Sequence, residues 1–306
     1  MKTTALKFLC SLSLLTPLVG AAPLDAVAWN LEWFPGGRPN ASQQDQAKHL
    51  KGAKAELKKI APDILLAQEL SDEKAFEQLA EEAGLAVHVF SKFPDYKDPE
   101  KPGRQQCGIA SNLTAHSAWF EDFQPVKDLP SLTRGFAFAA LEHPKGGLMM
   151  LYSVHLKSNR GSGTPRGAKN VAATRAEAVK QLVAHKAAME QKFTGEKIVG
   201  WLIAGDLNTN HDEQFPLCTV VKDLEAAGFY NTWSQTPKSE RATWRSFPDV
   251  ETRRFEPTTF DYAMTIGFKK VQAEMEKEVP RALSDHFPIK IELILEECPS
   301  ENMLLR

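Results

Sequence analysis

Short apolar segments alternate with amphipathic helical segments along the whole chain of 306 residues. The hydrophobic pattern predicts strands at residues 24–33, 64–68, 85–90, 108–112, 135–143, 148–155, 197–205, 259–266 and 288–295. It predicts helices at 43–60, 73–83, 172–192 and 215–227, with polar or Gly/Pro-rich loops at 94–104 and 159–167. Because the alternation runs on without a break in composition, we expect one α/β domain.

The composition is that of an ordinary folded protein. Hydrophobic residues make up 42% and charged residues 25% of the chain, which disfavours disorder, collagen and coiled coil. The formal net charge is -2, so no overall basic excess indicates a nucleic-acid partner. A local basic groove on a near-neutral protein stays possible.

The first 22 residues have the plan of a secretory signal peptide. Lys2 and Lys7 precede a mostly apolar run, and Gly20, Ala21 and Ala22 follow it. The alternative is a short membrane anchor, but the run is shorter than the roughly 20 residues that a spanning helix needs. We therefore expect a secreted or periplasmic protein without a stable membrane anchor, with a domain at 23–296 and a tail at 297–306. Loss of the two lysines leaves a mature chain that is more acidic.

The cysteines exclude a disulfide scaffold. Of the four cysteines, Cys10 lies in the expected signal peptide, which leaves Cys107, Cys218 and Cys298. An odd number permits at most one intramolecular disulfide. Because no cysteine or histidine cluster has zinc-ligand spacing, a structural zinc is not expected. We expect a monomer.

Polar side chains interrupt six apolar segments at or near their ends. Each alone could be a turn or cap residue, but Asp261 would have to lose solvent inside a buried strand. Ligand sites of α/β proteins gather at one rim of the sheet, so we expect the six positions to meet. The residues are Asn30, Glu69, His155, Asp206 with Asn208, Asp261, and Asp285 with His286.

The side chains at these positions suit one chemistry. Carboxylate and amide oxygens are preferred ligands of Mg²⁺, with Mn²⁺ or Ca²⁺ as alternatives. Histidines can exchange protons or contact a phosphate, and Asp261 can orient one of them, as the acid does in a hydrolase triad. No cysteine or GxSxG serine offers a nucleophile. The set therefore favours metal-assisted attack by water on a phosphate ester.

In their order along the chain, these motifs resemble the endonuclease/exonuclease/phosphatase superfamily, which has the deoxyribonuclease I-like fold. The resemblance covers residues 29–288 and rests on Trp29-Asn30, Gln68-Glu69, His155-Leu-Lys-Ser158, Gly205-Asp206-Leu-Asn208, Asp261-Tyr262 and Ser284-Asp285-His286-Phe-Pro288. It implies a four-layer α/β sandwich with two central mixed β-sheets. It also implies that Glu69 is the principal Mg²⁺ ligand, assisted by Asn30 and Asp285.

The same resemblance implies roles for the other site residues. Asp206 resembles the residue that orients or deprotonates the attacking water, and Asn208 its phosphate-positioning neighbour. His286 and Asp261 resemble the His–Asp pair that contacts the scissile phosphate. His155 resembles the second histidine of the deoxyribonuclease I branch, a candidate general acid.

The motifs do not choose the substrate, because branches of the superfamily cleave DNA, RNA, sphingomyelin, inositol phosphates or small phosphodiesters. Basic residues follow His155 without an acid before Glu177, a pattern suited to a polyanion, although a solvated loop face would look the same. We expect a secreted endonuclease acting on DNA or RNA; alternatives are a sphingomyelinase-like or small-molecule phosphoesterase and a catalytically dead binding subunit. The candidate substrate-binding residues are Lys157, Arg166, Lys169 and Arg175, with Arg104 and Arg134 as possible additions. Possible base-stacking residues are Trp33, Phe34, Trp244 and Phe247.

Overall fold

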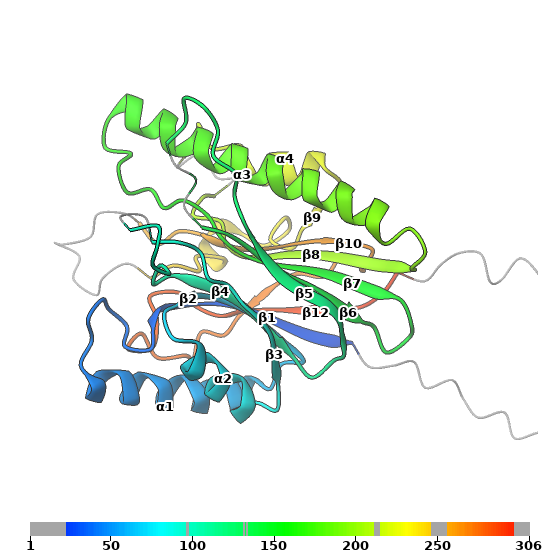
Figure 1. Cartoon of the computed structure of the whole chain (residues 1–306), viewed down its shortest axis with the longest axis horizontal. Coiled ribbons are helices and arrows are strands. Elements are labelled where there is room, and N and C mark those ends of the chain that lie inside the picture. The colour runs from blue at the N-terminus through cyan, green and yellow to red at the C-terminus, as the bar shows by residue number, and fades with distance from the viewer. Residues whose placement is uncertain are drawn as a thin grey trace, which may run out of the picture.

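A computed structural model describes residues 23–95, 98–130, 132, 134–210, 215–245 and 256–296. The expected signal peptide at 1–22, the expected tail at 297–306, Phe247 and Cys298 lie outside the described residues. Two six-stranded mixed sheets lie face to face, with helices on both outer sides (Figure 1). The predicted four-layer α/β sandwich is confirmed.

The first sheet has the strand order β11-β12-β1-β2-β4-β3. Its strands are β1 (Leu24–Phe34), β2 (Ile64–Leu70), β3 (Ala86–Phe90), β4 (Gln106–Ser111), β11 (Glu274–Met275) and β12 (Ile289–Leu293). Helices α1 (Gln43–Ile60) and α2 (Glu73–Glu82) cover its outer face (Figure 1).

The second sheet has the strand order β5-β6-β7-β8-β10-β9. Its strands are β5 (Ala115–Asp122), β6 (Gly135–Glu142), β7 (Leu148–His155), β8 (Ile198–Asp206), β9 (Tyr230–Asn231) and β10 (Asp261–Ile266). Helices α3 (Pro165–Lys192) and α4 (Val220–Ala226) lie on its outer side, and a single 3₁₀ turn, η1 (Lys238–Glu240), precedes β10.

Local capping explains where the long helices begin. Ser42 Oγ accepts a hydrogen bond from Asp45 N at the start of α1, and Asp72 Oδ1 accepts one from Ala75 N at the start of α2. Thr164 Oγ1 accepts one from Gly167 N, and Pro165 occupies the first position of α3, where a missing N–H costs nothing. The sequence predicted a loop at 159–167 and a helix that begins at residue 172. Pro165 is instead the first residue of the helix, which therefore starts before residue 172.

Other boundaries also differ from the prediction. Helix α4 begins at Val220 rather than residue 215, because residues 215–218 form a turn closed by the bond from Cys218 N to Phe215 O. Strand β5 was not predicted: as an edge strand it is only half-buried and lacks a regular apolar alternation.

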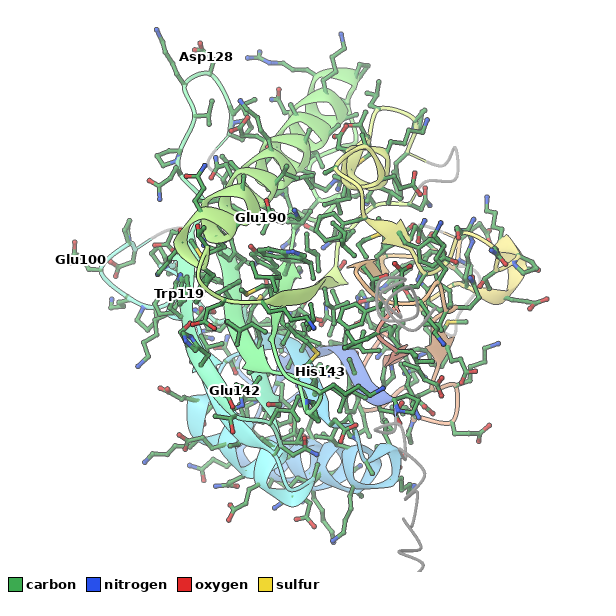
Figure 2. All side chains as sticks on the ribbon, turned by 90° about the vertical axis from the view of Figure 1, so that its right-hand side faces the viewer. Glu100, Trp119, Asp128, Glu142, His143 and Glu190 are labelled. Atoms are coloured by element: carbon green, nitrogen blue, oxygen red, sulfur yellow. The ribbon has the colours of Figure 1, made fainter. Side chains whose placement is uncertain are left out.

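Two parallel strand pairs bring several strand ends to one rim. Strands β1 and β2 run parallel in the first sheet, and β7 and β8 run parallel in the second. Antiparallel β10 begins at this rim, with Asp261 paired to Asp206. Figure 2 views the opposite end of the sandwich, where Glu142 and His143 close β6.

The core lies between the sheets and beneath the helices. A buried polar link crosses its interior: Gln68 Nε2 donates to Ser153 Oγ at 2.9 Å, and Ser153 Oγ donates to Ala67 O at 3.0 Å. This link joins β2 to β7 directly behind the rim and fixes one sheet against the other. Among the helices of the described residues, none is long and apolar enough to cross a bilayer.

Candidate active site

The rim brings together all six motifs that the sequence singled out. Glu69 lies near the end of β2, while His155 and Asp206 are the last residues of the paired strands β7 and β8. Asp261 is the first residue of β10, and His286 lies just before β12. The register of the paired strands therefore brings motif residues from positions 30 to 286 of the chain to the same rim.

Asn30 connects the two sheets at this rim. Its Nδ2 donates to Glu69 Oε1 at 3.3 Å and to Asp206 Oδ2 at 3.0 Å. Its Oδ1 accepts from Glu32 N at 3.1 Å, and its backbone carbonyl accepts from Ser284 Oγ at 2.6 Å. In this arrangement the NH₂ group of Asn30 faces the carboxylates of Glu69 and Asp206 and orients them; its role as an oxygen ligand of a metal stays a prediction.

Asp206 is buried and held by donors on both oxygens. Asn208 N donates to its Oδ1 at 2.8 Å, and Asn208 Nδ2 donates to its Oδ2 at 3.0 Å. Burial, reinforced by the negative charges of Asp261 and Glu69, raises the pKa of Asp206 to about 7. The preceding Gly205 has a φ of +135°, and a Cβ there would lie 2.2 Å from Val154 O, so this position needs glycine.

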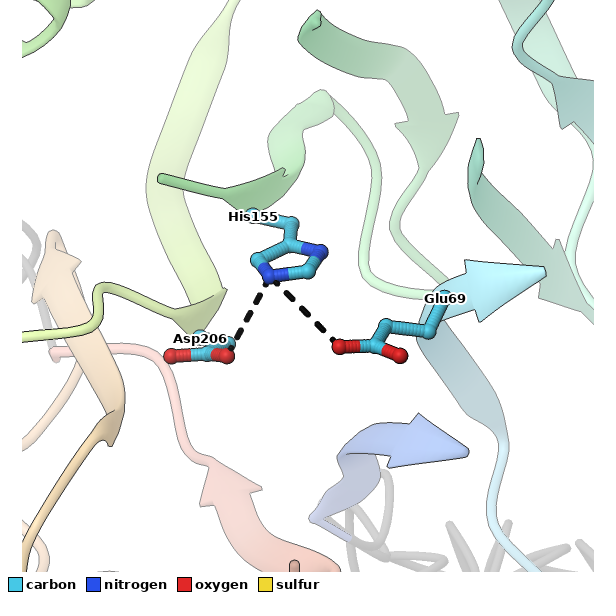
Figure 3. Close-up of side chains that lie close together, drawn as sticks. All are labelled: Glu69, His155 and Asp206. Atoms are coloured by element: carbon cyan, nitrogen blue, oxygen red, sulfur yellow. Dashed lines mark ion pairs between the residues drawn. The ribbon is translucent and has the colours of Figure 1, made fainter. Parts of the chain in front are cut away.

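Glu69, His155 and Asp206 form a compact three-residue cluster (Figure 3). His155 Nε2 lies 3.4 Å from Asp206 Oδ2 and 3.7 Å from Glu69 Oε1. One ligand atom of each residue lies within 4.8 Å of the others. Two carboxylates and an imidazole at this spacing fit a divalent cation, which would relieve the repulsion between the carboxylates.

The carboxyl group of Glu69 is shielded from solvent and lies near a second carboxylate, Asp285. Burial, followed by the negative charge of Asp285, raises the pKa of Glu69 above its ordinary value. Glu69 Oε2 accepts only from a backbone donor, Trp33 N, at 3.1 Å. Glu69 is the one residue shared by the predicted ligand set and the compact cluster.

His286 is held by a buried carboxylate. Its Nδ1 lies 2.7 Å from Asp261 Oδ2, which also accepts from Thr243 Oγ1 at 2.6 Å. Burial works against the charged imidazole, but Asp261, Asp285 and Asp206 raise the pKa of His286 well above its ordinary value. His286 is therefore a cation that points Nε2 toward the site, 3.9 Å from Asp206 Oδ2.

The surroundings of His155 favour its neutral form. Burial, followed by the positive charge of Arg134, lowers the pKa of His155 well below its ordinary value. A neutral imidazole can bind a cation or accept a proton, whereas a general acid must carry one. These pKa directions favour His286 over His155 as the proton-bearing histidine of the free protein.

Asp285 lies beside the cluster in a second set of hydrogen bonds. Its Oδ2 accepts from Trp244 Nε1 at 3.0 Å, and its backbone N donates to Glu32 Oε2 at 2.9 Å. Arg281 Nη1 also donates to Glu32 Oε2 at 2.8 Å. Trp244, which the sequence offered as a base-stacking residue, orients the carboxylate of Asp285 through its Nε1; its stacking role stays a prediction.

The backbone is strained at this rim. Glu32, Trp33, Glu69 and Asn208 all have φ between +45° and +59°, a left-handed conformation that non-glycine residues seldom adopt. Such strain persists only where the surroundings impose it, and it is typical of functional sites.

The family model of the Endonuclease/Exonuclease/phosphatase family matches residues 27–265. The chain belongs to this family. Its members are hydrolases of phosphoester bonds that typically depend on a divalent metal, which agrees with the cluster around Glu69. No curated protein matches the sequence.

Solved structures share the fold at low sequence identity. The endonuclease/exonuclease/phosphatase from Beutenbergia cavernae is 16% identical with a TM-score of 0.63, over 91% of this chain and 73% of that one. The Bacteroides vulgatus protein is 14% identical with a TM-score of 0.63, over 90% and 99%. Truncated Caenorhabditis elegans TDP2 is 17% identical with a TM-score of 0.57, over 89% and 98%.

The basic residues after His155 differ in their exposure to solvent. Arg166 and Lys169 are exposed on the first turns of α3. Lys157 is half-buried, and its Nζ donates to the carbonyls of Ser158 and Arg160.

The prediction that Arg175 binds the substrate is wrong. Its side chain is buried, its Nη1 donates to Lys157 O at 2.9 Å and to Asn159 Oδ1 at 3.0 Å, and its Nε donates to Cys218 Sγ at 3.2 Å. Arg175 therefore anchors the loop after His155 and does not contact substrate. The sequence showed its charge but not that α3 turns it inward.

Three residues at the site were missed or undervalued. Glu32 interrupts an apolar run much as Asp261 does, and the same desolvation argument could have found it. Arg134, noted only as a possible basic addition, donates from Nη1 to His155 O at 3.1 Å and supplies positive charge near Glu69. Thr243 lies in no recognisable motif, because its role depends on a contact with Asp261, 18 residues away.

Proposed function

We propose that this protein is a secreted, Mg²⁺-dependent phosphodiesterase, an endonuclease acting on DNA or RNA. The observation that carries the proposal is the convergence of Glu69, His155 and Asp206 with the charged pair His286–Asp261 at one rim. Secretion rests on the signal-peptide pattern of residues 1–22.

The residues of the cluster can hold the cation and the substrate. Glu69, with His155 and Asp285 around it, would hold the metal, which leaves Asp206 free to act on water. The metal would supply positive charge for the phosphate oxygens and favour a more acidic water. Mn²⁺ would fit the same oxygen and nitrogen donors, and Ca²⁺ is a further alternative.

The remaining steps belong to the side chains. Asp206, whose pKa is raised to about 7, accepts the proton of the attacking water, while Asn208 and Asn30 fix its carboxylate. Protonated His286, oriented by Asp261, donates to a nonbridging phosphate oxygen as negative charge accumulates there. The bond between phosphorus and the leaving oxygen then breaks; the leaving alkoxide takes up a proton from solvent, and Asp206 returns the proton of the attacking water to solvent.

The preference for nucleic acid rests on charge around the site. Arg160, Arg166 and Lys169 are exposed on the loop and helix that follow His155. A polyanion gains affinity from each contact with one of these basic side chains, because the contact releases counterions. A small phosphodiester would contact only the cluster around Glu69.

The test is hydrolysis by the mature protein, residues 23–306, of plasmid DNA, single-stranded RNA, sphingomyelin and bis-p-nitrophenyl phosphate. We expect cleavage of DNA or RNA with Mg²⁺ or Mn²⁺ and no cleavage with EDTA. Cleavage of sphingomyelin or of the small ester alone would contradict the nuclease assignment. Cleavage that survives EDTA would contradict the metal-dependent mechanism, and no cleavage of any substrate would contradict the enzyme assignment.

A further inference from the structure

A hollow in the surface lies beside the proposed metal site. It has a volume of about 300 Å³ and is lined by the segment after β1, by the end of β2 and by Arg104. Ligand pockets in proteins begin at roughly this size. Its walls include Trp33 and Ser71.

The hollow and the cluster share the same two strand ends. Trp33 donates its backbone N–H to Glu69 Oε2, while its side chain lines the hollow. Ser71 follows Glu69 by two residues and is tied to β1 by hydrogen bonds from its N and Oγ to Phe34 O. Trp33 therefore belongs to both places, so a substrate whose phosphate lies at Glu69 would have this hollow beside it.

The loop that forms the outer wall is preorganised. Gly36 N donates to His49 Nδ1 at 2.8 Å, and His49 Nε2 bonds Leu283 O at 2.6 Å. Because Nδ1 accepts, Nε2 must donate, so the buried His49 is the neutral Nε2–H tautomer. Gly36 has a φ of +127°, and a Cβ there would lie 2.5 Å from Ala41 Cβ. The wall is thereby linked to Leu283, next to the segment that carries Asp285 and His286.

The lining chemistry fits an aromatic ring next to an anion. Trp33 is half-buried and offers a ring, and two guanidinium groups, Arg38 and Arg104, line the same hollow. Arg104 Nη1 donates to Asn40 Oδ1 at 2.6 Å, while Arg38 pairs with Asp45 on α1. The one lining acid, Asp72, accepts from Ala75 N at the start of α2. Because the partner of Arg104, Asn40, is neutral, Arg104 keeps its positive charge at the hollow and disfavours a cationic group such as choline.

We propose that this hollow binds the nucleotide next to the scissile phosphate, with Trp33 stacking on its base and Arg104 contacting its phosphate. The inference rests on the proposed function, since it assumes that the substrate is a nucleic acid. Aromatic stacking accepts any base, so the pocket adds affinity without fixing a sequence.

The test is calorimetric titration of the mature protein in EDTA, which prevents cleavage, with the dinucleotide of deoxyadenylate and with that of adenylate. We expect Trp33→Ala to weaken binding about tenfold or more, as loss of one stack predicts. Trp33→Phe, which keeps a ring, should stay within about threefold of the wild type. Arg104→Ala should weaken binding of the dinucleotide but not of adenosine, which lacks the phosphate. Lys51→Ala, on the exposed side of α1, removes a charge away from the hollow. It should change the affinity for neither the dinucleotide nor adenosine.

Absence of dinucleotide binding by the wild-type protein would overturn the proposal. So would wild-type affinity in both Trp33→Ala and Arg104→Ala, or an equal loss in Trp33→Phe and Trp33→Ala. These outcomes are distinct from failure of the proposed function. If the wild-type protein cleaves nucleic acid and Trp33→Ala binds the dinucleotide with wild-type affinity, only the pocket proposal is refuted. If the wild-type protein binds the dinucleotide but cleaves no nucleic acid, only the nuclease assignment is refuted.

Discussion

His155 and His286 lie in the same site but are driven to opposite charge states. His155 has lost solvent and faces Arg134, whereas His286 is surrounded by three carboxylates. An acid and a base can act at one pH when their environments separate their pKa values in this way. The sequence could identify both histidines as functional but could not assign their charges, because these depend on neighbours far away in the chain.

His286→Ala tests the positive charge at the phosphate. Loss of the imidazole should lower kcat about 10²- to 10⁴-fold while leaving the fold intact, because the side chain acts on the reacting group. The measurement is steady-state hydrolysis, with circular dichroism as the check on folding. His116→Ala removes an exposed histidine on β5 and serves as the matched control. Equal turnover in the two variants would rule out this role for His286.

His49 provides a prediction for stability. Burial lowers the pKa of His49, so the unfolded chain binds its proton more readily than the folded one. The stabilising contribution of His49 should therefore be complete above about pH 6.5 and decline as the pH falls below this value. Urea unfolding of wild type and His49→Ala at pH 8 and pH 5 should show a smaller difference in unfolding free energy at pH 5. A difference that is independent of pH would contradict the neutral, buried state.

At the scale of elements, the start of α3 carries charge that a helix disfavours. Its first turn has no acidic residue, and Arg166 and Lys169 lie near its positive dipole end. The fold gains nothing from these charges at that position, which agrees with a role in binding a polyanion.

Arg166→Ala combined with Lys169→Ala should weaken binding of long nucleic acid and lower the slope of log K against log salt by about two. Thermal stability should stay equal or rise slightly, because two unfavourable charges leave the helix start. Fluorescence anisotropy with a labelled oligonucleotide at several salt concentrations measures both affinity and slope. An unchanged slope would show that these residues form only a solvated surface.

Strand ends were the elements that the sequence predicted best. An apolar run that stops at a polar residue marks a strand end, and Asp206 and His155 were found in this way. The start of α3 was missed because Pro165 can end a loop or open a helix with equal ease. Arg175 shows a further limit, since its charge is visible in the sequence but its burial depends on how α3 packs on the second sheet.

At the scale of the whole molecule, the two sheets act as a rigid frame for groups from both halves of the chain. Glu69 comes from the first sheet, while His155 and Asp206 come from the second, and Asn30 connects them. Net charge indicated nothing about this site, because several of the acids are gathered at the rim, where they can hold a cation. The order of the six motifs was the informative feature.

The central claim is that the carboxylate of Glu69 is essential to hydrolysis of nucleic acid at this rim. The most direct test compares Glu69→Gln with Glu77→Gln, an identical change at an exposed position on α2. The measurement is the rate at which each variant cleaves plasmid DNA and single-stranded RNA in Mg²⁺. We expect a loss of at least about 10²-fold in the cleavage rate of Glu69→Gln and the wild-type rate in Glu77→Gln, with both variants folded. Full activity in Glu69→Gln would contradict the central claim.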